Sequence, residues 1–229
     1  MFDKIYCLSL RKDKERRKKV SNRLNQIGLN YEFFDAYDGS LFHHIWQKLD
    51  NPIFTNQNYV ACTLSHLAIY KDAIENGFNR ILILEDDVIP HYGFNKLMIG
   101  NIPDNYDLLY LGFIPLSDDC VFWTYNIIND RFVKNNLFLA KNLWGLYAYS
   151  PSTEIMKEAI EKYSDGFPME LDRWFVEDVQ RRERSYGITP QPFCHDISYS
   201  NNTGHVDGTS LTKSIDRRFA TDENYIINV

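Results

Sequence analysis

The sequence predicts an α/β fold with a mainly parallel central sheet, and three observations support this prediction. Strand-like and helical segments alternate through the first 115 residues. The unbroken apolar run at residues 81–84 suits a strand that is covered on both faces, and residues 106–113 form a second run of this kind. No internal repeat or low-complexity linker interrupts the 229 residues. We therefore expect one domain, residues 1–229, with two halves, 1–115 and 116–229.

The elements of the first half follow from hydrophobic periodicity and from turn residues. Val20, Leu24 and Ile27 form an apolar stripe at helical spacing, and Gly28 is placed to end that helix. A turn after Asp38 ends the second strand. The predicted strands are residues 4–10, 31–39 with the closing turn, 80–87 and 106–113, and the predicted helices are residues 11–28 and 61–75.

The second half has a different pattern. Two strand-like segments flank an expected turn at Asn129-Asp130, and a further strand is expected at residues 143–150. A helix is predicted from about Ser152 to Tyr163, and a mixed segment follows it. From Cys194 onward the composition is polar and typical of loops.

Composition and charge exclude several classes of protein. A net charge of -6 argues against nucleic-acid binding, which favours a strongly basic surface. The 4 cysteines are scattered without a Cys-x-x-Cys pair, which excludes the usual zinc spacings and indicates reduced thiols in a cytosol-like compartment. The start of the chain lacks the order of a signal peptide, and no stretch approaches the roughly 20 apolar residues that span a bilayer. We expect a soluble, cytoplasmic protein.

The most informative segment is "ILILEDDVIP", residues 81–90, where an apolar strand runs into three adjacent carboxylates. Because side chains alternate along a strand, Glu85 and Asp87 are expected to point one way and Asp86 the other. Ligands of open α/β sheets bind beyond the carboxyl ends of strands, and paired carboxylates suit Mg²⁺ or Mn²⁺. The alternative is a solvated strand end, or an aspartate that caps the following turn.

The surroundings of this segment resemble glycosyltransferase family 25, which includes lipooligosaccharide glycosyltransferases and collagen galactosyltransferases. The similarity runs from residue 4 to about residue 200, while residues 120–140 are unmatched. It departs from the family pattern at His195, where the family more often has serine. The motifs that carry the resemblance, in chain order, are "IYCLSLRKDKERR", "YEFFDAYDG", "ACTLSHLAIYKDAIENG" with "ILILEDDVIP", "YDLLYLG", "LWGLYAYS", "MELDRWF" and "QPFCHDISYS".

The resemblance implies a GT-A-like, nucleotide-sugar-binding fold, with a donor-binding first half and an acceptor-side second half. It implies transfer of galactose or glucose from UDP-galactose or UDP-glucose, with inversion, to a glycan or protein hydroxyl. Asp87 is expected to bind Mn²⁺ (or Mg²⁺), which neutralises charge on the departing UDP, and Glu85 to contact the metal or the donor ribose. A late third metal ligand is expected among His195, Asp196 and His205, with His205 chosen for its glycine-flanked context.

Further donor contacts are expected around these strand ends. Arg11 and Arg16 can bind a diphosphate because guanidinium groups pair with phosphate oxygens in bidentate fashion. Most other charges of residues 11–23 are expected on a solvated helix face, with an anionic membrane surface as a second partner. The full set of expected donor-binding residues is Leu10, Arg11, Arg16, Ala36, Asp38, Ser65, His66, Glu85 and Asp86.

Asp172 is the candidate general base, because an inverting transfer needs a group that deprotonates the acceptor hydroxyl. Its alternative role is that of an acidic residue at a helix N-terminus. Two other classes of function stay open: a Mg²⁺-dependent nuclease or phosphohydrolase, and a non-catalytic domain that binds a nucleotide or glycan. The presence of Glu85 in place of the commoner aspartate favours the non-catalytic reading, although glutamate is an adequate oxygen ligand.

Overall fold

The computed structural model describes residues 2–42, 57–95, 103–115, 132–134, 137–189 and 191–196. Its helices are α1 (Lys14–Gln26), α3 (Gln57–Glu75), α6 (Thr153–Lys162) and α7 (Leu171–Trp174), with short turns at η1 (Gly39–Phe42), η3 (Phe175–Val179) and η4 (Gln180–Arg182). Its strands are β1 (Lys4–Ser9), β2 (Glu32–Asp35), β3 (Ile81–Glu85), β4 (Val88–Pro90), β5 (Leu108–Pro115), β6 (Phe132–Lys134), β7 (Leu137–Leu139), β8 (Leu143–Pro151), β9 (Ser185–Ile188) and β10 (Phe193–His195).

Eight strands form one sheet in the order β2-β1-β3-β8-β5-β9-β7-β6. The strands β2, β1 and β3 pair in parallel, as do β5 and β9, while β8 pairs antiparallel to both β3 and β5. Following these pairings along the sheet, only β8 and β7 run against the common direction. The predicted α/β fold with a mainly parallel sheet is confirmed. Strands from before and after residue 115 share this sheet.

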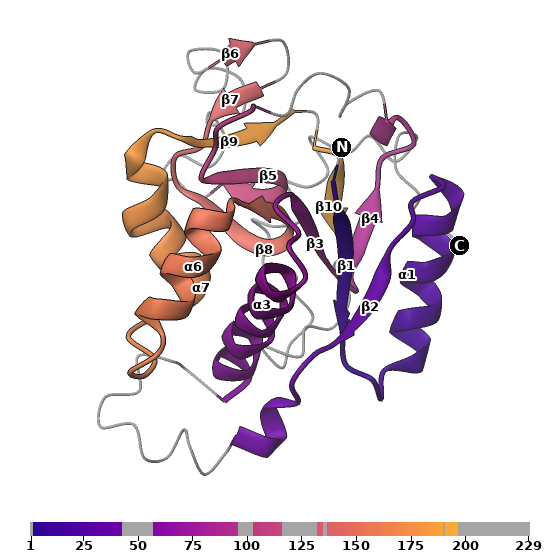
Figure 1. The fold of residues 1–229 in the computed structure, drawn as a ribbon. Helices are drawn as coiled ribbons and strands as arrows, with labels where there is room; N and C mark the ends of the chain where they lie inside the picture. The colour runs from indigo at the N-terminus through magenta and orange to yellow at the C-terminus, as the bar shows by residue number, and fades with distance from the viewer. Residues whose placement is uncertain are drawn as a thin grey trace.

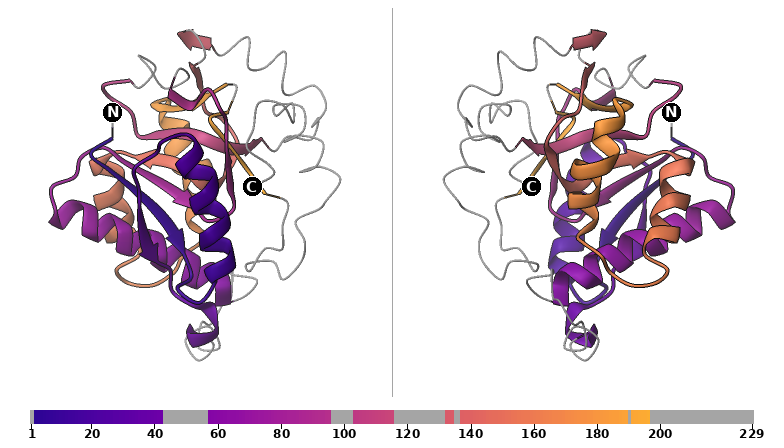
Figure 2. Two further views of the ribbon diagram at one scale, coloured as in Figure 1. Left: turned by 90° about the vertical axis from the view of Figure 1, so that its right-hand side faces the viewer. Right: turned by 90° about the vertical axis from the view of Figure 1, so that its left-hand side faces the viewer.

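Both faces of the sheet are covered, which explains the unbroken apolar runs. Figure 1 shows α3, α6 and α7 on one face and α1 on the other, and the side views in Figure 2 separate the two layers. Along β3, Ile81 and Ile83 pack into the core beside α3, whereas Leu82 and Leu84 pack into the core beside α1. All four side chains are fully buried. A strand that buries every side chain has no polar face, as the sequence of β3 indicates.

The strands β4 and β10 form a separate two-stranded antiparallel pair, with His195 opposite Val88. This pair lies against the α1 side of the main sheet. Gly112 of β5 permits this close approach. A Cβ atom there would lie 2.2 Å from the Tyr147 ring and 2.8 Å from the carbonyl oxygen of Phe193. The last described segment of the chain is therefore held beside the residues that follow β3.

Several predicted boundaries shift by two or three residues, such as the strand expected at 106–113, which spans Leu108–Pro115. Two further boundaries near the site need correction. The helix expected at 61–75 begins at Gln57, one turn before the predicted start. The segment from Cys194 onward, predicted as loop, starts with strand β10, where Cys194 and His195 are buried. The expected turn at 129–130 lies outside the described residues. The helix predicted at about 152–163 is confirmed, with the Ser152 hydroxyl accepting from the Ile155 backbone N–H.

Candidate active site

The carboxyl ends of β2, β1 and β3 meet at one edge of the sheet, where a cleft of about 350 Å³ opens. The ends of three parallel strands bring together side chains that are far apart in the sequence. The cleft contains both cationic and anionic groups and one exposed aromatic ring, that of Tyr37. Its lining residues are Leu8, Ser9, Leu10, Lys12, Arg16, Ala36, Tyr37, Asp38, Gly39, Ser40, Gln57, Asn58, Ala61, Cys62, Ser65, Glu85, Asp86 and Asp87.

Glu85 ends β3, whereas Asp86 and Asp87 lie in the turn that follows, so the predicted alternation does not extend to Asp87. Asp86 points to the α1 side, where the Ser9 hydroxyl donates to it at 2.5 Å and the Arg16 Nε at 2.7 Å. Burial raises the pKa of Asp86, and the charge of Arg16 offsets part of this rise. Arg16 therefore supplies positive charge to the cluster. Asp86 is already well paired, which leaves its two neighbours as the groups that need a further cation.

Asp87 is the carboxylate with the least compensation. Its Oδ1 atom is buried and has no hydrogen-bond partner among the described residues, and Arg16 approaches its Oδ2 at 3.4 Å. Burial, together with the nearby charge of Glu85, raises the pKa of Asp87 to about 7, while Arg16 and His195 oppose the rise. A buried carboxylate oxygen without a donor is a fitting ligand for a divalent cation. The residues at this position thus fit the metal that the family resemblance implies.

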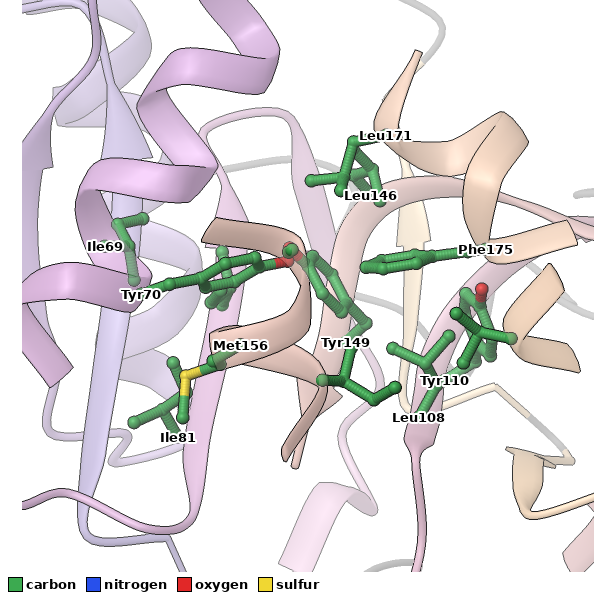
Figure 3. Close-up of a cluster of buried hydrophobic side chains, with 14 of the residues drawn as sticks. Ile69, Tyr70, Ile81, Leu108, Tyr110, Leu146, Tyr149, Met156, Leu171 and Phe175 are labelled. Carbon is green, nitrogen blue, oxygen red and sulfur yellow. The ribbon is translucent and has the colours of Figure 1, made fainter. Parts of the chain in front are cut away.

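Glu85 points to the α3 side, where it meets a buried polar chain. Its Oε1 lies 3.4 Å from Nε2 of His66, and the other ring nitrogen of His66 lies 2.9 Å from the Tyr149 hydroxyl. The Tyr149 hydroxyl in turn lies 2.5 Å from that of Tyr70, and Figure 3 shows these two side chains meeting end to end. His66, expected to bind the donor, is fully buried behind Glu85. It positions Glu85 rather than lining the cleft that the described residues form.

A second cleft of about 260 Å³ lies on the other side of the same carboxylates. It shares Cys62, Glu85 and Asp87 with the first cleft. Its remaining lining residues are mostly aromatic, apolar or acidic: Tyr59, Thr63, Ile114, Trp144, Gly145, Leu146, Tyr147, Glu170, Leu171, Asp172 and His195. Two chemically different clefts therefore meet at Glu85 and Asp87.

Asp172 lies in this second cleft, in the first turn of the short helix α7. Burial raises the pKa of Asp172 to about 6, and the neighbouring charges of Glu170 and Glu85 add to the rise, while the backbone N–H of Arg173 opposes it. The helix continues directly into a π-helical turn, Phe175–Val179. Such turns are frequent at functional sites. A carboxylate with a pKa near neutrality is suited to accept a proton.

The candidates for a third metal ligand separate clearly. His195 lines the second cleft together with Glu85 and Asp87. Asp196 accepts from Lys19 at 2.6 Å and from the buried Arg23 at 2.7 Å. Although burial alone raises its pKa, these two hydrogen bonds hold the pKa of Asp196 below its usual range. Asp196 is thus engaged in ion pairs, and of the two described candidates His195 has the better placement. His205 lies outside the described residues.

The expected donor residues are mostly brought together, and the exceptions are His66, which is buried behind Glu85, and Arg11. Leu10, Arg16, Ala36, Asp38, Ser65, Glu85 and Asp86 all line the first cleft. Arg11 does not belong to the lining formed by the described residues; its side chain is 85% exposed and pairs with Asp35. The neighbouring Lys12 lines the cleft instead and lies 2.5 Å from Asp38. A shift of one residue in the turn after β1 decides which cation faces the cleft.

The cleft residues that were missed in the sequence include Lys12, Tyr37 and Cys62. Tyr37 stands between Ala36 and Asp38, so its neighbours already marked the position. Its backbone N–H donates to the Ser65 hydroxyl at 2.9 Å, which fixes the turn, and 47% of the residue is exposed. The signal for Cys62 was its spacing from His66, four residues later on the same helix.

Comparison with known proteins gives the family. The model of glycosyltransferase family 25, described as an LPS biosynthesis protein, matches residues 2–167, well over half of the chain. This chain belongs to glycosyltransferase family 25. The predicted recognition is confirmed, and the α/β architecture agrees with the GT-A-like fold class that the family implies.

Relatives extend the similarity over nearly the whole chain. A glycosyltransferase 25 family member of Drosophila melanogaster is 28% identical over 93% of this chain and 39% of its own length. The mouse protein named inactive glycosyltransferase 25 family member 3 is 26% identical over 48% of this chain and 22% of its own. The chain thus spans less than half the length of both relatives. A solved glycosyltransferase involved in glycosylation of the major capsid of PBCV-1 aligns with a TM-score of 0.48 and 14% identity, covering 94% of this chain and 97% of its own.

None of the described helices is long and apolar enough to cross a membrane.

Proposed function

We propose that this family 25 chain transfers a hexose, galactose or glucose, from a UDP-sugar to a hydroxyl of a glycan or protein, with inversion and with a divalent metal. The observation that carries the proposal is the meeting of two unlike clefts at Glu85 and Asp87. A transferase needs a donor and an acceptor on opposite sides of one reacting carbon. Two separate but adjoining clefts provide this arrangement.

The first cleft supports the donor assignment through its charge and its aromatic ring. Lys12 and Arg16 lie where a diphosphate would need cations. The exposed ring of Tyr37 offers a face on which a nucleobase can stack, as bases do on aromatic side chains. Glu85 and Asp87 would hold Mn²⁺ or Mg²⁺, with His195 as a third ligand. When bound, the metal supplies positive charge that stabilises the departing UDP.

The second cleft supports the acceptor assignment. Its aromatic lining, with Trp144 half-buried, suits the apolar face of a sugar. Asp172 would accept the proton of the acceptor hydroxyl as its oxygen bonds to the anomeric carbon. The bond from that carbon to the UDP oxygen breaks in the same step, and attack from the opposite side inverts the configuration. The Asp172 carboxyl, with its raised pKa, is matched to this task near neutral pH.

The name of the mouse relative shows that family membership alone does not decide activity. The test is therefore turnover itself: UDP release with Mn²⁺, screened over several UDP-sugars and an array of glycan and peptide acceptors. UDP with Mn²⁺ should raise the melting temperature more than either alone, because metal and diphosphate complete one another's coordination. ADP should stabilise the protein less than UDP. Stabilisation by UDP without turnover would favour a non-catalytic nucleotide-binding domain, and equal effects of ADP and UDP would contradict the donor assignment.

A further inference from the structure

A mixed group of potential metal ligands, which does not include Asp87, lies at the junction of the two clefts. The Sγ atom of Cys62, a ring nitrogen of His66 and a carboxylate oxygen of Glu85 all lie within 4.8 Å of one another. Cys62 and His66 stand one helical turn apart on α3, so both face the end of β3, where Glu85 is. His66 is fully buried, while Cys62 and Glu85 are partly exposed to the clefts.

We propose that Cys62, His66 and Glu85 form a binding site for Zn²⁺. A thiolate, an imidazole nitrogen and a carboxylate are the three kinds of ligand that zinc takes in proteins. A hard cation such as Mg²⁺ prefers oxygen ligands and does not gain from the thiolate. Three protein ligands leave a fourth tetrahedral position for a further ligand, and Cys62 and Glu85 line both clefts. The sequence excludes zinc sites built on a Cys-x-x-Cys pair. The site proposed here uses a single cysteine.

The environment of His66 supports this assignment. Nε2 of His66 lies 3.4 Å from Glu85, which is long for a hydrogen bond. The opposite nitrogen, Nδ1, is held by the Tyr149 hydroxyl at 2.9 Å. Metal-binding histidines characteristically bond a polar group through their second nitrogen, which fixes the ring and its tautomer. With Zn²⁺ on Nε2, the ring proton resides on Nδ1 and the Tyr149 oxygen accepts it. The Cys62 thiol releases its proton to solvent as the Zn–S bond forms.

Glu85 belongs to both metal sites, which gives the zinc site a consequence for the reaction. A carboxylate that binds Zn²⁺ beside Cys62 is withdrawn from the pair that it forms with Asp87. Zn²⁺ should therefore compete with Mn²⁺ and inhibit transfer. The inhibition rests on the proposed function, whereas the binding of Zn²⁺ does not.

Cobalt substitution tests the binding directly. Co²⁺ added to the metal-free protein should give the near-ultraviolet charge-transfer absorption of a cobalt–thiolate bond, and Zn²⁺ should displace it. Cys62→Ser should abolish the absorption, whereas Cys194→Ser should keep it, because Cys194 is buried in β10 away from this group. Absorption that survives in a folded Cys62→Ser protein, or that never appears in the wild type, would overturn the site.

Two further variants separate this site from the proposed manganese site. Tyr149→Phe should weaken Zn²⁺ binding by about 10- to 100-fold, the usual effect of losing the partner of a ligating histidine. Asp87→Asn should retain Zn²⁺ binding and lose Mn²⁺ binding, measured by calorimetry for zinc and electron paramagnetic resonance for manganese. If Asp87→Asn lost the binding of both Zn²⁺ and Mn²⁺, the proposal of two distinct metal sites would be contradicted. Because neither readout needs turnover, an inactive enzyme that still binds Zn²⁺ through Cys62 would contradict the proposed function and leave the zinc site standing.

Discussion

The two clefts at the end of β3 share Glu85 and Asp87 but differ in almost everything else. The first holds Lys12, Arg16 and an exposed tyrosine ring, and its walls come from the ends of parallel strands. The second is lined by aromatic residues and by Asp172, and its walls come from β8, α7 and β10, with α3 contributing to both clefts. The difference indicates a division of labour. Residues of the first cleft should determine donor affinity, and residues of the second should determine the rate of the chemical step.

The strongest test of this comparison is Asp87→Asn, because Asp87 stands at the junction. An amide keeps the shape of the side chain but lacks the charge that holds a cation. We expect both donor affinity and turnover to fall, with kcat/KM lower by roughly 10³-fold or more, since the metal contributes several kcal/mol of charge stabilisation. Calorimetry with UDP and Mn²⁺ and transfer kinetics measure the two effects.

The matched control is Asp104→Asn, which changes a fully exposed aspartate that pairs only peripherally with Arg80. It should leave affinity and rate unchanged. Near-normal activity in a folded Asp87→Asn protein would remove Asp87 from the metal site.

Asp172→Asn should affect the second cleft alone. If Asp172 accepts the proton of the acceptor hydroxyl, its loss should lower kcat by about 10²- to 10⁴-fold, the usual contribution of a positioned base. The affinity for UDP with Mn²⁺ should stay nearly unchanged, because the first cleft is intact. A loss of donor affinity as large as that of Asp87→Asn would make Asp172 a ligand or a structural group, with Glu170 of the same cleft as the next candidate for the base, since Asp196 is held in ion pairs.

The pH dependence of the reaction follows from the same residue. Burial raises the pKa of Asp172 to about 6, so the carboxyl is protonated below that pH and cannot accept a proton. At saturating Mn²⁺, which keeps Asp87 ionised, the rate should level off about one pH unit above 6 and fall about tenfold per unit below 6. In Asp172→Asn this fall should disappear, while the residual rate stays low. An unchanged acid limb in the variant would assign the titration to another group.

Much of the first cleft could be predicted from the sequence, and the reason is local. The segment at 81–90 predicts both its structure and its role. Its apolar residues indicate a strand that is covered on two faces, and the carboxylates that follow indicate a cation site at the strand end. Glu85 and Asp86 meet partners on opposite sides of the sheet, as predicted, although β3 ends at Glu85 and Asp86 lies in the following turn. The error at Arg11 shows the limit of this approach. Whether Arg11 or Lys12 faces the cleft depends on the turn after β1, whose backbone the side-chain pattern does not determine.

The second cleft was less predictable, because long-range pairing builds it. β8 inserts between β3 and β5, although it follows both in the sequence. β10 pairs with β4, and the backbone N–H of Asp196 donates to the carbonyl oxygen of Asp87. These contacts bring His195 close to carboxylates that lie more than 100 residues earlier in the sequence. No hydrophobic periodicity in the sequence predicts them. The role of His66 was also hidden, since its position behind Glu85 depends on Tyr149 of β8.

The smallest expected effect concerns Lys12, and it tests the donor side without touching the metal. Lys12 is largely exposed, with 60% of its side chain accessible, and its ion pair with Asp38 is screened by water. Lys12→Ala should therefore weaken UDP binding by only about two- to fivefold, because exposed charge pairs contribute little. The loss should shrink as salt is added, because ions screen exposed charges. Lys18→Ala, an exposed lysine of α1 that is not part of the cleft lining, is the control and should bind UDP normally. Equal losses in both variants would mean that Lys12 acts through the overall charge of the basic helix rather than through the donor diphosphate.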